Sequence, residues 1–219
     1  MSAGGPGRPS RGDRRLPWKT GEYLVLDFET TGLDFNRDRV ISFGAFPIRG
    51  GRVEVGEARY QLVDPGGREP SHGSVVVHRI RPVDLVGAPS QEAMKAELAE
   101  ALDLRYLVAW EARVEVGFLA RIFQIPARKL LRTTIDVRDL VVVLEGEPVR
   151  ALSLTEAATR FGVPVSDPHH ALDDALVTGQ LFLVAAARLA RREGPVSVGD
   201  LLRARPPPPP PLGRPRAPI

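Results

Sequence analysis

Short apolar runs, closed by turn residues, alternate with amphipathic stretches along the middle of the chain. The first run, residues 23–26, is β-prone and leads into a Thr-Thr-Gly turn, which predicts a buried strand ending at Phe28 or Glu29. Two longer runs flank Gly50 and Gly51, a dipeptide typical of a hairpin turn. The predicted strands comprise residues 23–29, 39–48, 52–63, 106–110 and 134–136.

Between and after these strands the apolar positions recur with a helical period. Pro89 and Ser90 open one such stretch, with Ser90 as the expected N-cap and Met94, Leu98 and Leu102 on one face. Further helices are predicted around residues 118–122, 137–144, 153–161 and 171–192. An antiparallel meander followed by strands that alternate with helices predicts a single α/β domain with a mixed sheet.

The composition is that of a soluble globular protein. The 219 residues are 43% hydrophobic and 26% charged, which is enough for one domain with a full core. No apolar run approaches a membrane span, and the N-terminus lacks the apolar region of a secretory signal. The absence of cysteine excludes disulfides and thiolate metal sites and fits a cytoplasmic protein. The net charge is +3, and arginine supplies nearly all of the positively charged side chains. Charge alone is therefore only weak evidence for nucleic-acid binding.

Both ends of the chain have a biased composition. Residues 1–17 are rich in Arg, Gly and Pro and are expected to be disordered. Residues 196–219 are expected to form a Pro/Arg-rich tail with polyproline II character, which could dock a protein partner. Such tails are more often solvated and dispensable. The ordered domain is therefore predicted over residues 18–195.

Asp27 and Glu29 stand at the end of the first predicted strand. Because side chains alternate along a strand, both carboxylates point to the same face. Two neighbouring carboxylates repel each other unless a cation or a proton compensates them, and hard oxygen ligands suit Mg²⁺ or Mn²⁺. A solvated pair at a strand end is the alternative, and for an isolated D-x-E it is the commoner explanation.

A second group of titratable side chains lies at the start of the last long predicted helix. Residues 169–175 read His-His-Ala-Leu-Asp-Asp-Ala, which puts Asp174 in the opening turns of the helix and His169 in the loop before it. A histidine in a mobile loop beside a carboxylate can act as a general base, because its pKa lies near neutrality. The alternative is that the aspartates only stabilise the helix N-terminus through its dipole.

Together the two groups resemble the first and last motifs of the DEDDh 3′–5′ exonucleases, the group of the proofreading epsilon subunit of bacterial DNA polymerase III. The matching motifs are Asp27-x-Glu29-Thr30-Thr31-Gly32 and His169-x-Ala171-x-x-Asp174. Stretches at residues 38–45, 77–80, 87–89, 138–140 and 153–154 are also similar to the family. The resemblance runs from about residue 23 to residue 183, nearly the whole predicted domain.

This resemblance implies an RNase H-like fold with a mixed five-stranded sheet, in which four carboxylates hold two divalent ions, Mg²⁺ or Mn²⁺, and a histidine activates water. Carried over by position, the metal ligands are Asp27, Glu29, Glu115 and Asp174, and the general base is His169. The terminal nucleotide is expected beside Thr30, Thr31, Gly32, Leu33 and His78. The implied substrate is the 3′ end of single-stranded or frayed nucleic acid, with DNA favoured over RNA, and the product is a nucleoside 5′-monophosphate.

The middle motif departs from the family pattern. Where the family has His-Asn this chain has Trp110 and Glu111, and where the family has Phe-Asp it has Val114 and Glu115. The fourth carboxylate is therefore one methylene longer. Mg²⁺ requires nearly octahedral geometry at about 2.0–2.1 Å, and displacing a catalytic group by about 1 Å can cost roughly a hundredfold in rate. A longer side chain could instead take the place of a bound water.

Three functional hypotheses follow. The favoured one is an active metal-dependent exonuclease, because Asp27, Glu29, His169 and Asp174 all retain the required chemical type. The second is a catalytically weakened family member that binds nucleic-acid ends, and the changes at the middle motif support it. The third and weakest is an adaptor that acts through its Pro-rich tail.

Overall fold

The structure, a computed structural model, describes residues 13–146 and 152–206. Its centre is a mixed sheet with the strand order β3-β2-β1-β5-β6, and β4 pairs with β2 outside this path. The strands are β1 (Tyr23–Thr30), β2 (Val40–Arg49), β3 (Arg52–Val53), β4 (Arg59–Leu62), β5 (Tyr106–Ala109) and β6 (Thr134–Asp136). The predicted α/β class with a mixed sheet is confirmed.

Strand directions bring several chain segments to one edge of the sheet. β1 runs antiparallel to β2 and parallel to β5, and β5 runs parallel to β6. The carboxyl ends of β1, β5 and β6 therefore meet at the same edge, where ligand sites of α/β sheets usually form. The predicted hairpin turn is also present, with Gly50 and Gly51 both at positive φ, a conformation that glycine adopts without strain.

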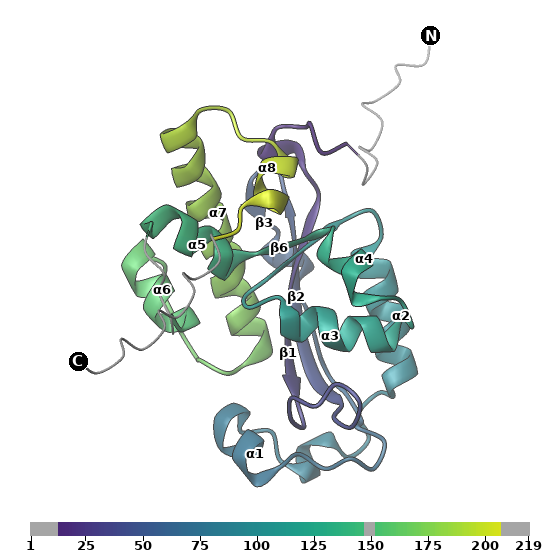
Figure 1. Cartoon of the computed structure of the whole chain (residues 1–219). Helices are drawn as coiled ribbons and strands as arrows, with labels where there is room; N and C mark the ends of the chain where they lie inside the picture. Colours follow the sequence, from purple (N-terminus) through teal and green to yellow (C-terminus); the bar gives the residue numbers. More distant parts are fainter. Residues whose placement is uncertain (1–12, 147–151, 207–219) are drawn as a thin grey trace, which may run out of the picture.

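Helices cover both faces of the sheet (Figure 1). They are α1 (His72–His78), α2 (Gln91–Leu102), α3 (Arg113–Ile122), α4 (Ala127–Leu131), α5 (Val137–Glu145), α6 (Leu154–Phe161), α7 (Ala171–Glu193) and α8 (Val198–Arg203). In Figure 1, α5, α6 and α7 lie on one side of the sheet and α2, α3 and α4 on the other, while α1 lies beyond the end of β1.

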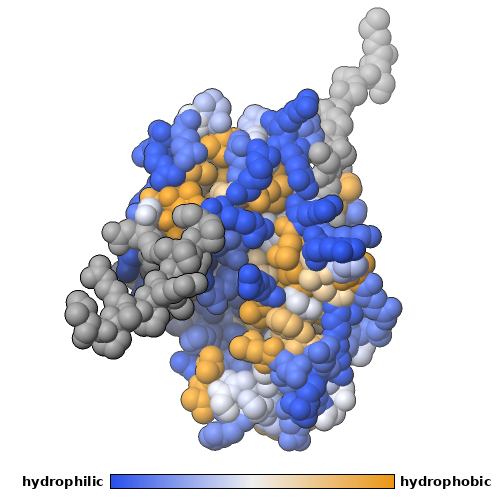
Figure 2. All heavy atoms as spheres, viewed as in Figure 1, coloured by the Kyte–Doolittle hydropathy of each residue, from blue (hydrophilic) through white to orange (hydrophobic). Residues whose placement is uncertain are grey.

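The alternation of side chains in β1 separates two hydrophobic cores. Tyr23 and Val25 pack into a cluster with Phe182 of α7, whereas Leu24 and Leu26 pack into a second cluster with side chains of α2 and α3. Burial on both faces explains why residues 23–26 read as a continuous apolar run. On the face seen in Figure 2, hydrophilic residues cover much of the surface and hydrophobic residues form patches between them. No helix in the described part of the chain is long and apolar enough to cross a membrane.

The structure corrects two boundaries. The sheet of the described residues has six strands rather than five, because a 3₁₀ turn at Val55–Glu57 interrupts the predicted third strand and divides it into β3 and β4. The ordered domain also extends past residue 195, since Val198 and Leu201 of α8 are buried and Trp18 N donates to Val196 O. Of residues 1–17, predicted to be disordered, residues 13–17 are described and pack against the start of α8, where Val198 N donates to Leu16 O. Residues 1–12 and the polyproline II character predicted for residues 207–219 lie outside the described residues.

Several predicted helices are present in the structure. α2 begins after Ser90, whose side chain accepts a hydrogen bond from the Ala93 amide, and α3, α5, α6 and α7 fall in the predicted regions. Three short helices, α1, α4 and α8, were not predicted. The longest helix, α7, matters most for the site because its first turn carries Asp174.

Candidate active site

The end of β1 carries the first two acidic side chains. Asp27 is paired with Gly44 of β2 and Glu29 with Ser42, so both carboxylates project from the same face of the sheet. That face is the one covered by α7, because Tyr23 and Val25 on the same side of β1 pack into the cluster that includes Phe182. The local sequence thus points two acids toward the start of α7.

Gly44 determines how closely α7 can approach. A Cβ atom at this position would collide with the backbone of Ala171 and Leu172, the first two residues of α7. A residue with a side chain would push the helix away from the sheet, whereas glycine lets the first turn rest directly on β2 beside Asp27. The close contact brings Asp174 to the two acids of β1.

Asp27, Glu29 and Asp174 form one carboxylate cluster. Each offers an oxygen, and these oxygens all lie within 4.8 Å of one another. Burial raises the pKa of Asp27 well above its usual value of 3.8, and the neighbouring carboxylates raise it further. Burial and the charge of Asp174 raise the pKa of Glu29 to about 8. Burial also raises the pKa of Asp174, and the neighbouring His169 and His170 oppose this only in part. A cation bound by the three acids would favour their ionised forms.

Glu115 lies next to this cluster but is not one of its three members. It sits in the first turn of α3, is 3% exposed, and its Oε2 has no hydrogen-bond partner. Burial is the main cause that raises its pKa to about 8. Among the charges that raise the pKa of Asp27, that of Glu115 has the largest effect. A buried carboxylate oxygen without a partner is unusual in a folded protein, and its position beside Asp27 fits the donor set of a hard cation.

His169 occupies the loop that leads into α7. Its backbone is in the left-handed region with φ of 65°, and its amide donates to Asp174 Oδ2 over 2.9 Å. This bond ties the loop to the carboxylate cluster while the exposed imidazole stays free to approach a ligand. The next residue, His170, is held differently, with Nδ1 3.0 Å from Asp173 Oδ2 and its ring stacked on Tyr60.

The residues expected beside a terminal nucleotide differ in how they are held. Thr30 and Thr31 are buried, and their hydroxyls donate within the same loop, to Gly32 O and to Asp38 Oδ1. Leu33 is 71% exposed. Gly32 is required because a Cβ there would collide with the Asp38 carboxylate, so its small size serves the loop itself.

His78 closes the end of α1. It is buried, its Nδ1 accepts the Ile80 amide over 3.0 Å, and its Nε2 has no hydrogen-bond partner. Burial lowers its pKa, so the ring is neutral at pH 7. The Nε2 atom is itself buried and the ring interacts with the backbone of Thr30, so His78 supports the loop after β1 rather than presenting a free donor.

The extra carboxylate of the divergent middle motif is paired with an arginine, although burial and then the charges of Asp136 and Glu111 raise the pKa of Glu115. Glu111 has a positive φ of 49° and pairs with Arg138 over 3.2 Å, and Trp110 packs against the core on the α7 side. The extra carboxylate of Glu111 is therefore compensated by an arginine.

One residue of the site was missed from the sequence. Asp136 ends β6 at the same sheet edge, and its Oδ2 accepts the amide of Ala112, the N-cap residue of α3, over 2.9 Å. Its Oδ1 accepts the Arg138 amide over 3.0 Å. Asp136 thus connects β6 to the start of the helix that carries Glu115. Its place at the carboxyl end of a short parallel strand was the signal that could have identified it.

Comparison with known proteins agrees with this geometry. The family model described as Exonuclease (RNase_T) matches residues 24–182. The chain belongs to this exonuclease family. The match extends from β1 to the middle of α7 and therefore includes Asp27, Glu29 and Asp174.

Two relatives illustrate the range of this exonuclease family. The PolC-type DNA polymerase III of Thermotoga maritima is 34% identical over 162 residues, which are 74% of this chain and 12% of that protein. The epsilon subunit of DNA polymerase III from Aquifex aeolicus is 28% identical over 82% of this chain and 86% of its own length. The chain therefore spans about one eighth of the PolC-type relative and most of the epsilon-type relative.

The fold is also shared with solved exonucleases. The structure of E. coli Exonuclease I in complex with a dT13 oligonucleotide superimposes with a TM-score of 0.67 at 18% identity, covering 79% of this chain and 42% of that chain. The likeness confirms the RNase H-like fold predicted from the motifs.

Proposed function

We propose that this chain is a metal-dependent 3′–5′ exonuclease that removes nucleotides from single-stranded or frayed DNA ends. The observation that carries the proposal is the convergence of Asp27, Glu29 and Asp174 within 4.8 Å, with the unpartnered carboxylate of Glu115 beside them. A purely structural role would not need four partly or fully buried acids with raised pKa values gathered at one end of the sheet.

The acids would hold Mg²⁺ or Mn²⁺, in the two-ion arrangement that the family resemblance implies. Bound there, the metal would supply Lewis-acid polarisation of the scissile phosphate and stabilise the leaving oxygen. Asp27 would be a central ligand, because the charges of Glu115, Glu29 and Asp174 all act on it. The fit rests on the all-oxygen donor set and on the buried Oε2 of Glu115.

His169 is proposed as the general base. Its exposed imidazole would take a proton from the attacking water as the oxygen of that water bonds to phosphorus. The bond from phosphorus to the 3′-oxygen of the preceding nucleotide then breaks, the 3′-oxygen is protonated, and a nucleoside 5′-monophosphate leaves. The hydrogen bond that the His169 amide donates to Asp174 would keep the base next to the site in each turnover.

The loop after β1 is proposed to hold the terminal nucleotide. Leu33 offers an exposed apolar surface for the sugar or base, and the buried His78 would act by supporting the loop through the backbone of Thr30. Thr30, Thr31 and Gly32 would act mainly through the shape of the loop, because the two hydroxyls are already engaged within it. The DNA preference follows relatives that are DNA polymerase III proteins.

A catalytically weakened, end-binding protein is the second candidate. The observation that favours it is Glu115, which has one methylene more than the aspartate of the family and lies outside the tight cluster of three acids. A partner for the Pro/Arg-rich tail also remains a proposal, and a polymerase partner is suggested by the epsilon-type and PolC-type relatives.

Substitution of single acids separates these candidates. Asp27→Ala and Asp174→Ala should abolish Mg²⁺-dependent release of nucleotides while the fold is retained, and Asp103→Ala, an exposed aspartate at the end of α2, is the matched control. Full activity in either cluster variant would overturn the site assignment. Glu115→Asp should raise the rate if the longer side chain only detunes the site. An unchanged rate in both Glu115→Asp and Glu115→Ala would show that Glu115 is not a ligand.

A further inference from the structure

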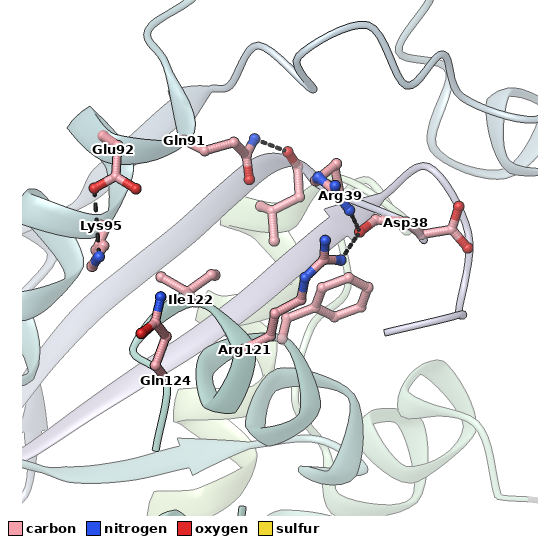
Figure 3. A pocket seen from close by; sticks show the side chains of 10 residues that line it. Asp38, Arg39, Gln91, Glu92, Lys95, Arg121, Ile122 and Gln124 are labelled. Carbon is pink, nitrogen blue, oxygen red and sulfur yellow. Dashed lines mark hydrogen bonds and ion pairs between the residues drawn. The ribbon is translucent and has the colours of Figure 1, made fainter. Parts of the chain in front are cut away.

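A hollow of about 170 Å³ lies where the loop of residues 31–39 meets α2 and α3 (Figure 3). Its polar lining includes Arg39, Gln91, Lys95, Arg121 and Gln124. None of these side chains belongs to the carboxylate cluster. The two sites are joined by the loop, which leaves β1 beside the cluster and returns at Arg39.

Two arginines converge at this hollow. Nη1 of Arg39 donates to Asp38 O over 3.0 Å, and Nη1 of Arg121 donates to the same oxygen over 2.9 Å. The two nitrogens therefore lie no more than about 6 Å apart. Like charges at this distance repel each other, and the charge of Arg39, after burial, lowers the pKa of Arg121.

Carboxylates near the two arginines act on them without pairing. Within residues 13–146 and 152–206, neither guanidinium forms an ion pair, and their other bonds go to the carbonyls of Arg37 and Phe35. The carboxylate of Asp38 bonds to Thr31 and Arg68, and the charges of Asp34 and Asp38 oppose that of Arg121 only from a distance.

The remaining acid and base at the rim largely compensate each other. Lys95 Nζ lies 3.5 Å from Glu92, which is mostly exposed. The two guanidinium groups therefore leave a net positive charge at the hollow that the distant Asp34 and Asp38 compensate only in part.

The pair also has donors to spare. Each arginine uses only Nη1 in the bonds described above, so Nε and Nη2 of both groups remain available. The Nη1 bonds of Arg121 anchor the loop to α3. The edge-to-face contact between Phe35 and Phe118, with ring centroids 5.3 Å apart, also contributes to this anchoring. Two partly buried guanidinium groups with spare donors match the geometry of a phosphate, which arginine binds through two parallel hydrogen bonds.

We propose that this hollow is a phosphate-binding site formed by Arg39 and Arg121, with Lys95 at its rim. The group bound is a phosphate, either from the backbone of a nucleic-acid strand outside the cleavage site or free in solution as inorganic phosphate. The bound anion offsets the repulsion between the two positive charges and holds the loop of residues 31–39 in place.

Binding of inorganic phosphate to the full chain tests this site. The measurement is the rise in melting temperature with phosphate at constant ionic strength in EDTA, which removes metal from the carboxylate cluster. Arg121→Gln and Arg39→Gln should each weaken phosphate binding about ten- to a hundredfold, the loss of one charge-assisted contact. Arg128→Gln, an exposed arginine on α4, is the matched control and should bind like the wild type.

Two variants are needed because a substitution could weaken phosphate binding by loosening the loop rather than by removing a contact to the phosphate. Arg121→Gln removes a bond between α3 and the loop, whereas Arg39→Gln removes only bonds to its near neighbours in the chain. Equal phosphate binding by all four proteins, or no saturable effect of phosphate on the wild type, would overturn the proposal. The outcome is independent of catalysis, so an inactive protein that binds phosphate here would contradict the proposed function alone.

A second set of measurements identifies the source of the phosphate. Binding of a single-stranded oligonucleotide is measured at several salt concentrations in the Asp27→Ala background, and only this step rests on the proposed function. If the strand supplies the phosphate, Arg121→Gln should weaken binding and reduce the slope of log affinity against log salt by about 0.7. If free phosphate is the ligand, oligonucleotide binding should not change while phosphate binding is still lost.

Discussion

Neutralising Glu29 should stabilise the metal-free protein at alkaline pH. Burial and the charge of Asp174 raise the pKa of Glu29 from its usual 4.5 to about 8. A carboxyl group whose pKa is higher in the folded state favours folding while it is protonated. The stability gained from the protonated Glu29 is complete below about pH 4.5. It decreases as the pH rises further and is lost above about pH 8. Glu29→Gln keeps the shape of the side chain and removes this loss.

The size of the effect follows from the shift. A change from 4.5 to about 8 corresponds to at most about 5 kcal/mol at 1.36 kcal/mol for each pH unit. Glu29 is only partly buried and is coupled to Asp27 and Asp174, so water and proton sharing reduce this limit. We expect Glu29→Gln to raise the free energy of unfolding by about 1–3 kcal/mol at pH 9 in EDTA. Near pH 5 the variant and the wild type should differ little.

Urea unfolding in EDTA at pH 5, 7 and 9 measures this difference. Glu69→Gln, an exposed glutamate that forms no ion pair among the described residues, is the control for removal of one charge. Wild type and control should lose stability together as the pH rises, whereas Glu29→Gln should lose less. Parallel pH dependence in all three proteins would refute the electrostatic account of the cluster.

Metal should reverse the order of stability. A ligand at one hundred times its dissociation constant stabilises a folded protein by about 2.7 kcal/mol. Mg²⁺ or Mn²⁺ should therefore stabilise the wild type and the Glu69→Gln control at pH 8, and should stabilise Glu29→Gln much less. Equal stabilisation of all three proteins would show that the acids are not the metal ligands.

Three further substitutions test how the fold positions the site. Gly44→Ala should destabilise the protein by about 1–3 kcal/mol and lower kcat, because the added methyl group displaces the start of α7, and urea unfolding with single-turnover kinetics would show both effects. His169→Asn should lower kcat about 10²–10⁴-fold without weakening oligonucleotide binding; an unchanged kcat would exclude His169 as the base. Asp136→Ala should destabilise by about 1–3 kcal/mol and reduce kcat more than Asp136→Asn, whose amide oxygen can still accept one amide; equal kcat in both variants would refute a positioning role for Asp136.

The part of the site predicted from sequence consists of residues close together in the chain. Asp27 and Glu29 share a strand, and His169 and Asp174 share a helix start, so local periodicity placed each pair. Joining the two pairs required the family resemblance, because nothing in a single sequence measures the distance between β1 and α7. The importance of Gly44 became visible only when α7 was found resting on it.

The elements missed from the sequence had weak or hidden local signals. α1 contains Gly73 and three consecutive valines, which favour a helix poorly, and it is held by the N-cap Ser71. α8 has a capping box between Ser197 and Asp200. Because it lies next to the Pro/Arg-rich stretch, the sequence analysis assigned it to the tail.

Long-range contacts were beyond local reasoning. The bond from Asp136 Oδ2 to the Ala112 amide joins residues 24 positions apart. The bond from Arg121 to Asp38 O joins residues 83 positions apart. Such contacts depend on the tertiary arrangement, and the sequence around Asp136 or Arg121 does not indicate which residue each contacts.

Degradation of end-labelled oligonucleotides tests the central claim most directly. Purified protein is incubated with single strands labelled at the 5′ or the 3′ end, as DNA and as RNA, with Mg²⁺, Mn²⁺ or EDTA, and with Asp27→Ala as the inactive control. The account predicts a metal-dependent ladder of 5′-labelled products and immediate release of the 3′ label as a mononucleotide, both absent in the control. Retained binding of 3′ ends without cleavage under either metal would contradict it and would make the chain an end-binding member of the exonuclease family.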